Sequence, residues 1–112
     1  MKAPAALESL DALAHATRLA AFRALVVAGA DGLAVGELRE ALRVPPATLT
    51  AHLNVLRAAK LVLDRRDGRS IVVRANLARM NDLIAYLTEN CCAGGASCAP
   101  GVSCPPESKR SP

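Results

Sequence analysis

The feature that most restricts the fold of this chain is the pair Pro45-Pro46, which separates two short stretches with helical patterns. A residue that precedes proline is pushed out of the helical region, so a helix over about 33–42 has to end before this pair. Pro46 can occupy the first turn of a new helix, where its missing N–H has no intrahelical partner in any case. Leu49, Leu53 and Leu56 then recur at helical spacing and are expected to face inward. The sequence therefore predicts two helices joined by a tight turn.

The outer face of the helix that begins at Pro46 carries short side chains, namely Ala47, Thr50, Ala51 and Asn54. This face has no long hydrophobic residue and no carboxylate. Such a helix can approach the edge of a base pair closely without repelling phosphate. An ordinary surface helix would show the same pattern, so the segments that follow have to decide between the two interpretations.

Positive charge is concentrated in the segment directly after this helix. The net charge of the chain is +4, and residues 57–74 contain six bases and two acids, so they account for the whole excess. A charged segment is often no more than a solvated surface. Here the excess lies beside a helix with short outer side chains, which favours a patch that faces phosphate.

Two extended pieces, 61–65 and 70–74, surround the pair Asp67-Gly68. This pair is a strong hairpin signal because glycine readily takes the positive φ that such turns require. The predicted hairpin holds most of the positive charge and is expected to lie along a phosphate backbone as a wing. Two strands are too few for a sheet that is stable alone, so we expect them to lean on the helices.

Three further helices are expected over 5–15, 17–28 and 76–90. Apolar stripes mark each of them: Leu7, Leu10, Leu13 and Ala14 in the first, Leu19, Phe22, Leu25 and Val26 in the second, and Leu77, Met80, Leu83, Ile84 and Leu87 in the third. Asn76 is expected to cap the last helix. His15, at the junction of the first two helices, suits a structural hydrogen bond better than a metal site. We expect the first and last helices of two subunits to pack together in a homodimer.

The length of 112 residues fits one small domain, here residues 1–90, followed by a flexible cysteine-rich tail over 91–112. Aromatic residues are limited to Phe22 and Tyr86, so the core has to be built from leucine, valine and alanine. No secretory pattern opens the chain, and no apolar run reaches the about 20 residues of a membrane span. The expected fold class is mainly α with a small two-stranded β-hairpin, in a cytoplasmic, homodimeric winged helix-turn-helix protein.

All four cysteines lie in the tail, at positions 91, 92, 98 and 104. A reducing compartment disfavours disulfides, so metal or metalloid binding is the natural alternative to incidental cysteines. Structural zinc prefers cysteine pairs separated by two to four residues, whereas Cys91 and Cys92 are adjacent. Three thiolates without a fixed fourth ligand suit a soft trivalent ion such as arsenic or antimony. The C-terminal end of a helix disfavours thiolates because the helix dipole is negative there, so binding has to expel their protons, and this argues against a nucleophilic enzyme site.

The chain resembles the ArsR (ArsR/SmtB) family of metal-sensing winged-helix repressors over roughly residues 7–90. The resemblance is carried by Gly36-Glu37-Leu38-Arg39-Glu40-Ala41-Leu42, by the run from Thr48 to Arg57 with its His-Leu-x-x-Leu-Arg pattern, and by Asp67-Gly68-Arg69. It implies a homodimer that binds operator DNA without inducer and leaves it on binding a metal or metalloid.

Two metal-binding patterns of that family are missing. Residues 35–42 contain no cysteine for the arsenic site of the third helix, and residues 76–90 contain no histidine for the zinc site of the last helix. The remaining pattern resembles an arsenic-responsive subgroup in which a Cys-Cys pair and a later Cys follow the last helix. On that resemblance Cys91, Cys92 and Cys98 would bind As(III) or Sb(III) as inducer, and Cys104 does not match. No organic cofactor is expected.

The functional hypothesis is a repressor of an arsenic-resistance operon. Its expected partner is double-stranded operator DNA with an inverted repeat, and no membrane is expected as a partner. Candidate base or backbone contacts are Thr48, Thr50, Ala51, His52 and Asn54, and candidate phosphate contacts are Arg57, Lys60, Arg65, Arg66 and Arg69. Phosphate contacts would position the protein without reading sequence. Three alternatives are a Cd(II), Pb(II) or Zn(II) sensor of the same fold, a thiol redox sensor, and a thiol enzyme such as an arsenate reductase.

Overall fold

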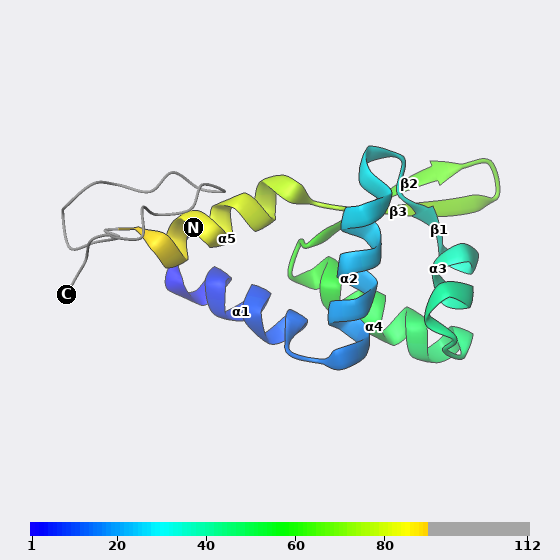
Figure 1. Cartoon of the computed structure of the whole chain (residues 1–112), viewed down its shortest axis with the longest axis horizontal. Helices are drawn as coiled ribbons and strands as arrows, with labels where there is room; N and C mark the ends of the chain where they lie inside the picture. The colour runs from blue at the N-terminus through cyan, green and yellow to red at the C-terminus, as the bar shows by residue number, and fades with distance from the viewer. Residues whose placement is uncertain (90–112) are drawn as a thin grey trace.

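The computed structural model describes residues 1–89 and confirms a winged helix-turn-helix (Figure 1). The elements are α1 (Ala3–Leu13), α2 (Ala16–Ala28), the 3-10 turn η1 (Gly29–Asp31), β1 (Leu33–Ala34), α3 (Val35–Leu42), α4 (Pro46–Ala58), β2 (Val62–Asp67), β3 (Ser70–Ala75) and α5 (Leu77–Thr88). Within the described part, no single helix is long and apolar enough to cross a membrane; α1 and α2 with its 3-10 extension pass that test only as a pair, bent by 99°.

The core lies where α2, α3 and α4 meet the sheet. Leu49, Leu53 and Leu56 are at most 1% exposed, so the predicted inner face of α4 is confirmed. Leu25 of α2 and Leu38 of α3 are equally buried and belong to the same cluster. Such a leucine core holds α4 at a fixed position against the rest of the chain.

The buried face of α2 differs from the predicted one. Phe22 and Leu25 are buried as expected, but Leu19 and Val26 are 44% and 42% exposed, and Ala21 is buried in their place. An alanine allows α2 to approach its neighbours closely, which turns the two larger side chains toward solvent.

The predicted hairpin is confirmed as β2 and β3, but the sheet has a third antiparallel strand that was not predicted, in the order β1-β3-β2. Leu33 and Ala34 were expected to begin a helix, but they pair with Val73 and Val72 of β3. Gly32 (φ 67°) makes this approach possible, because a Cβ there would collide with the carbonyl oxygen of Val73. The helix α3 starts only after this short strand.

The hairpin turn lies one residue later than predicted. Asp67 still pairs with Ser70, so Gly68 and Arg69 are the two turn residues. Gly68 has a positive φ of 63° whereas Arg69 has not. These signs match a type II′ turn, which places glycine first.

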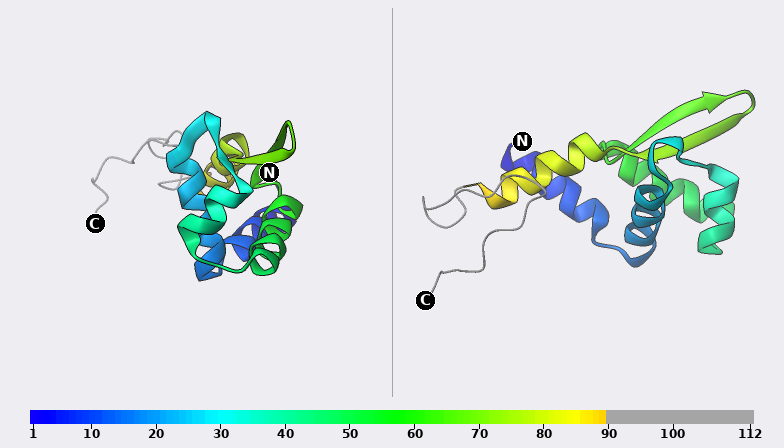
Figure 2. Two further views of the ribbon diagram at one scale, coloured as in Figure 1. Left: turned by 90° about the vertical axis from the view of Figure 1, so that its right-hand side faces the viewer. Right: turned by 45° about the horizontal axis from the view of Figure 1, so that its top comes forward.

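The helices α1 and α5 lie side by side at the end of the molecule opposite the wing (Figures 1 and 2). As predicted, Asn76 caps α5, because its Oδ1 accepts a hydrogen bond from the backbone N–H of Arg79 (3.3 Å). Several leucines here face solvent: Leu7 and Leu10 of α1 are 65% and 40% exposed, and Leu87 of α5 is 55% exposed. The apolar stripes of the two helices are therefore only partly used within one chain.

Candidate nucleic-acid interface

The turn between α3 and α4 fixes where α4 begins. Arg43 ends α3 in the left-handed conformation (φ 55°), and Pro45 is extended (φ −63°, ψ 152°). Pro45 offers no side-chain cap, but its carbonyl oxygen accepts the first helical hydrogen bond, from the N–H of Leu49 (3.0 Å). Pro46 occupies the first turn as predicted. A rigid start is needed if the first turns of a helix are to enter a groove in one orientation.

The outer surface of α4 is exposed and made of small or polar side chains. Of the five predicted base or backbone contacts, the four other than His52 are exposed, namely Thr48, Thr50, Ala51 and Asn54. Ala47 is exposed beside them. The face thus has the short, uncharged surface that close contact with base-pair edges requires.

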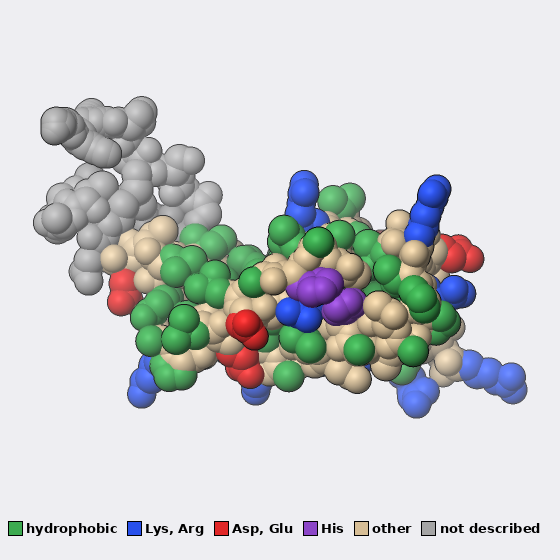
Figure 3. All heavy atoms as spheres, turned by 90° about the horizontal axis from the view of Figure 1, so that it is seen from below, with side chains coloured by type: hydrophobic (Ala, Val, Ile, Leu, Met, Phe, Trp, Pro, Cys, Tyr) green, Lys and Arg blue, Asp and Glu red, His purple; other side chains and the backbone are tan. Residues whose placement is uncertain are grey.

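His52 is separated from that outer surface. It is half-buried, and its ring lies 4.5 Å from the ring of His15, centroid to centroid. His15 in turn caps α2, because its Nδ1 accepts the N–H of Thr17 (3.1 Å). Figure 3 shows the two histidines next to each other on the face seen from below. His15 is therefore the structural histidine that the sequence favoured, and His52 joins α4 to the start of α2.

Burial lowers the pKa of His52 from its ordinary value of 6.5, and the neighbouring charges of His15 and Arg18 lower it further. Arg18 is held in place by the carbonyl oxygen of Ala12, which accepts from its Nε (2.6 Å). The lowered pKa favours the neutral imidazole of His52, which disfavours a role for this side chain as a cation toward phosphate.

Arg57 connects α4 to the base of the wing. Its Nε forms an ion pair with Asp64 of β2 (2.9 Å), and its NH1 group donates to Oδ1 of Asn54 (3.0 Å). The arginine is therefore neutralised, and it orients the amide of Asn54 on the outer surface of α4. This arrangement makes Arg57 a positioning residue more than a free phosphate contact.

The three wing arginines that were predicted to contact phosphate, Arg65, Arg66 and Arg69, do not all lie on one side of the wing. The register pairs Arg66 with Ile71 and Arg65 with Val72, so neighbouring positions point to opposite faces. Arg66 shares the face of Asp64, which bonds to α4, whereas Arg65 lies on the other face. Arg69 is at the tip and lines a hollow of about 400 Å³ together with Thr50 and Arg57 of α4. Arg66 and Arg69 are thus the wing cations placed beside α4.

Lys60 is exposed, with a positive φ of 63°, in the connection from α4 to β2. Its carbonyl oxygen accepts from Nδ2 of Asn76 (2.9 Å), which ties this connection to the start of α5. A helix of this length spans roughly 20 Å, so Lys60 is far from the first turn of α4. Any phosphate that it contacts is a different one from those near Thr48.

Comparisons with known proteins agree with this geometry. The family described as "Helix-turn-helix domain" matches residues 13–65. The structure is similar to NolR from Sinorhizobium fredii, with a TM-score of 0.62, 32% identity and coverage of 78% of this chain and 84% of that one. It is also similar to an ArsR-like transcriptional regulator from Rhodococcus sp. RHA1, with a TM-score of 0.67, 28% identity and coverage of 75% and 76%. The chain belongs to the ArsR-like transcriptional regulators.

A third similar structure is that of HlyU from Vibrio cholerae N16961, with a TM-score of 0.62, 27% identity and coverage of 78% of this chain and 97% of that one. No curated protein matches the sequence. As an ArsR-like regulator, the chain is a DNA-binding protein, and α3, α4 and the wing form its helix-turn-helix and hairpin.

One cation of this ArsR-like regulator was missed by the sequence reasoning. Arg43 is exposed in the turn between α3 and α4, directly before the first turn of α4. Its place just before Val44-Pro45-Pro46 could have indicated it, but it lies outside residues 57–74, where the excess of positive charge is concentrated. An exposed cation three residues before Pro46 is a further candidate for a phosphate contact near the start of α4.

The proposed inducer ligands Cys91, Cys92 and Cys98 lie outside the described residues, as does Cys104. Within residues 1–89 no group of three or more histidine, cysteine, aspartate or glutamate side chains is placed to hold a metal ion.

Proposed function

We propose that this ArsR-like regulator represses an arsenic-resistance operon and leaves its operator when As(III) or Sb(III) binds Cys91, Cys92 and Cys98. The family membership supports operator binding by α4 and the wing. The position of the thiols supports the rest: all four cysteines of the chain follow α5 closely, and the domain itself offers no metal cluster in its described residues. Soft thiolates favour the soft trivalent ions.

The end of α5 is the element through which binding would act. Glu89 leaves the helical conformation (ψ 143°), so the helix stops two residues before Cys91. A pyramid of three sulfurs around one ion would draw Cys98 back toward Cys91 and Cys92 and constrain this helix end. Because α5 packs against α1, the constraint reaches the end of the molecule that carries exposed leucines.

A homodimer through α1 and α5 completes the proposal. Leu7, Leu10 and Leu87 would be buried between two subunits, and the two copies of α4 would face an inverted repeat. Inducer binding at the end of α5 would change the spacing or tilt of these two helices. A useful regulator needs a coupling free energy on the order of 1–3 kcal/mol between inducer and DNA.

The test is operator release, measured by fluorescence anisotropy of a labelled duplex as arsenite is added. Cys91→Ser, Cys92→Ser and Cys98→Ser should each bind DNA as the unchanged protein does and fail to release it. Cys104→Ser is the matched control and should release DNA normally. A Cys98→Ser protein that arsenite still releases would overturn the three-thiol site.

The same assay separates the alternative sensors. If Cd(II), Pb(II) or Zn(II) releases DNA and Cys104→Ser abolishes this response, the chain senses a divalent ion with four thiols. If peroxide alone releases DNA, the cysteines form a redox switch. Either result would show that the inducer is not As(III) or Sb(III), and the proposal of operator binding by α4 and the wing would still stand.

A further inference from the structure

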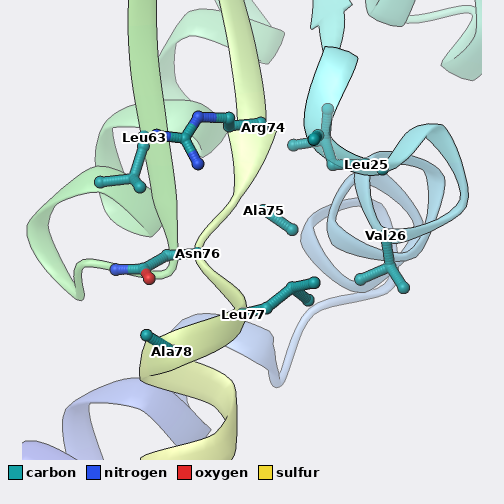
Figure 4. Close-up of a pocket in the computed structure, with 10 residues that line it drawn as sticks. Leu25, Val26, Leu63, Arg74, Ala75, Asn76, Leu77 and Ala78 are labelled. Carbon is teal, nitrogen blue, oxygen red and sulfur yellow. The ribbon is translucent and has the colours of Figure 1, made fainter.

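A hollow of about 350 Å³ lies where the end of α2, the sheet and the start of α5 meet. Figure 4 shows its lining: Leu25 and Val26 come from α2, Leu63 and Arg74 from the sheet, and Leu77 from α5. The volume is at the small end of the range for ligand pockets in proteins. Four of these five side chains are apolar, and the fifth is a cation.

Arg74 is the polar group of the hollow for which the described residues provide no hydrogen-bond or ion-pair partner. Its guanidinium has no carboxylate within salt-bridge distance in residues 1–89. Asn76, the other long polar side chain in the lining, is already engaged, because it donates to the carbonyl oxygen of Lys60 and accepts from the N–H of Arg79. A half-buried guanidinium above apolar walls lacks an anion in this arrangement.

The face of the sheet distinguishes this site from the DNA-binding surface. The register pairs Arg74 with Leu63, so both side chains lie on the same face. Asp64 and Val73 form the neighbouring pair on the opposite face, and Asp64 bonds to Arg57 of α4. Arg74 therefore points away from α4, and a phosphate held between α4 and the wing is not its natural partner.

We propose that this hollow binds a small organic carboxylate with a compact hydrocarbon body. The carboxylate would form charge-assisted, two-pronged hydrogen bonds with Arg74. The hydrocarbon would lie against Val26, Leu63 and Leu77, which are 36–50% exposed, and would replace water on their apolar surface. Inorganic phosphate would pair with the guanidinium but would leave the apolar side chains of the hollow in contact with water. The site is independent of the cysteines and of the inducer proposed above.

The test uses the reduced full-length protein and two probes of matched shape, hexanoate and 1-hexanol. Titrations followed by NMR amide shifts should place hexanoate at residues 25–30, 63 and 74–78. Hexanoate should bind at least about tenfold more tightly than 1-hexanol, because hydrogen bonds to a charged group are worth about that factor or more. Equal binding of both probes, or no saturable binding, would overturn the proposal.

Three variants locate the site. Arg74→Gln should weaken hexanoate about tenfold and leave 1-hexanol unchanged. Arg23→Gln removes the same charge from an exposed position of α2 outside the hollow, and should bind hexanoate normally. Ala78→Phe fills the hollow from the exposed first turn of α5, and should abolish binding while Arg74 remains. Normal hexanoate binding by Arg74→Gln would overturn the proposal, as would equal losses in both arginine variants.

Discussion

The two ends of this molecule differ in how completely their side chains are buried and hydrogen-bonded within one chain. At the DNA-binding end, α4 inserts three leucines into the core, each at most 1% exposed, and Arg57 bonds to both Asp64 and Asn54. At the other end, α1 buries only Ala6, Ser9 and Ala12, and α5 buries only Leu83.

Polar groups show the same difference. In the described residues, the two buried side-chain atoms without a hydrogen-bond partner are Ser9 Oγ of α1 and Arg79 Nε of α5. Unpaired buried groups of this kind cost stability. The comparison teaches that one chain packs the helix-turn-helix end completely, whereas the α1–α5 end keeps apolar surface exposed, and this is the surface that the proposed dimer would use.

The largest effect is expected from a cavity in the core beneath α4. Leu53→Ala should lower the free energy of unfolding by about 2–5 kcal/mol, because the side chain is 1% exposed and the space cannot fully collapse. Urea unfolding followed by circular dichroism measures this change. Val55→Ala, at a 36% exposed position of the same helix, is the control and should cost less than about 1 kcal/mol. Similar losses in both variants would mean that α4 is not anchored by its leucine face.

The next effect, on dimer stability, is expected from the exposed leucines of α1 and α5. Leu7→Glu should raise the dimer dissociation constant at least about tenfold, since a buried leucine contributes about 1.5–3 kcal/mol and the two-fold axis repeats the change. Analytical ultracentrifugation measures the constant. Val27→Glu places the same charge on α2 at a residue that is 88% exposed, and should leave it unchanged. If the two variants dissociate alike, α1 is not part of the interface.

A smaller effect separates the two faces of the wing. Arg69→Ala should lower the salt dependence of operator binding by about one unit of slope and weaken binding to all sequences alike. Arg65→Ala removes the same charge from the face that points away from α4, so its slope should change less. Anisotropy titrations at several salt concentrations measure both. A larger change for Arg65 would reverse the assignment of the faces.

The smallest effect is a pH dependence at the contact between α4 and α2. The folded-state pKa of His52 lies below its ordinary value of 6.5, so the native state binds its proton less readily than the unfolded chain does. This stability contribution is fully present above about pH 7 and is lost as the pH falls past 6.5 and through the folded pKa. Urea midpoints should therefore drop between pH 7.5 and 5.5, and less so in His52→Gln. An equal drop in both proteins would remove His52 as the cause.

Local signals in the sequence were enough for much of the DNA-binding end. Pro46, the leucines of α4 and the Asn76 cap act within one or two turns of their own helices, and each is found where it was predicted. Distant partners decided what the sequence missed. Leu33 lies in a strand because it pairs with Val73, forty positions later in the chain. His52 is half-buried because the ring of His15, at the start of α2, lies against it.

The sequence also could not show how the arginines of the wing divide between two faces. The turn lies at Gly68-Arg69, one residue later than Asp67-Gly68, and a shift of one residue exchanges the faces of a strand. The exposed leucines of α1 and α5 did agree with stripes that the pattern marked. The cysteines lie outside the described residues, so their role stays a prediction.

Hydrogen exchange of the full-length protein, measured free, with operator DNA, and with DNA plus arsenite, tests the central claim directly. DNA should protect residues 46–58 and 66–71 from exchange. Arsenite should then remove this protection and slow exchange at the end of α5 and in the following residues through Cys98. Protection by DNA at α1 and α5 alone, or α4 still protected when arsenite saturates the thiols, would contradict the division between a DNA-binding end and a controlling end.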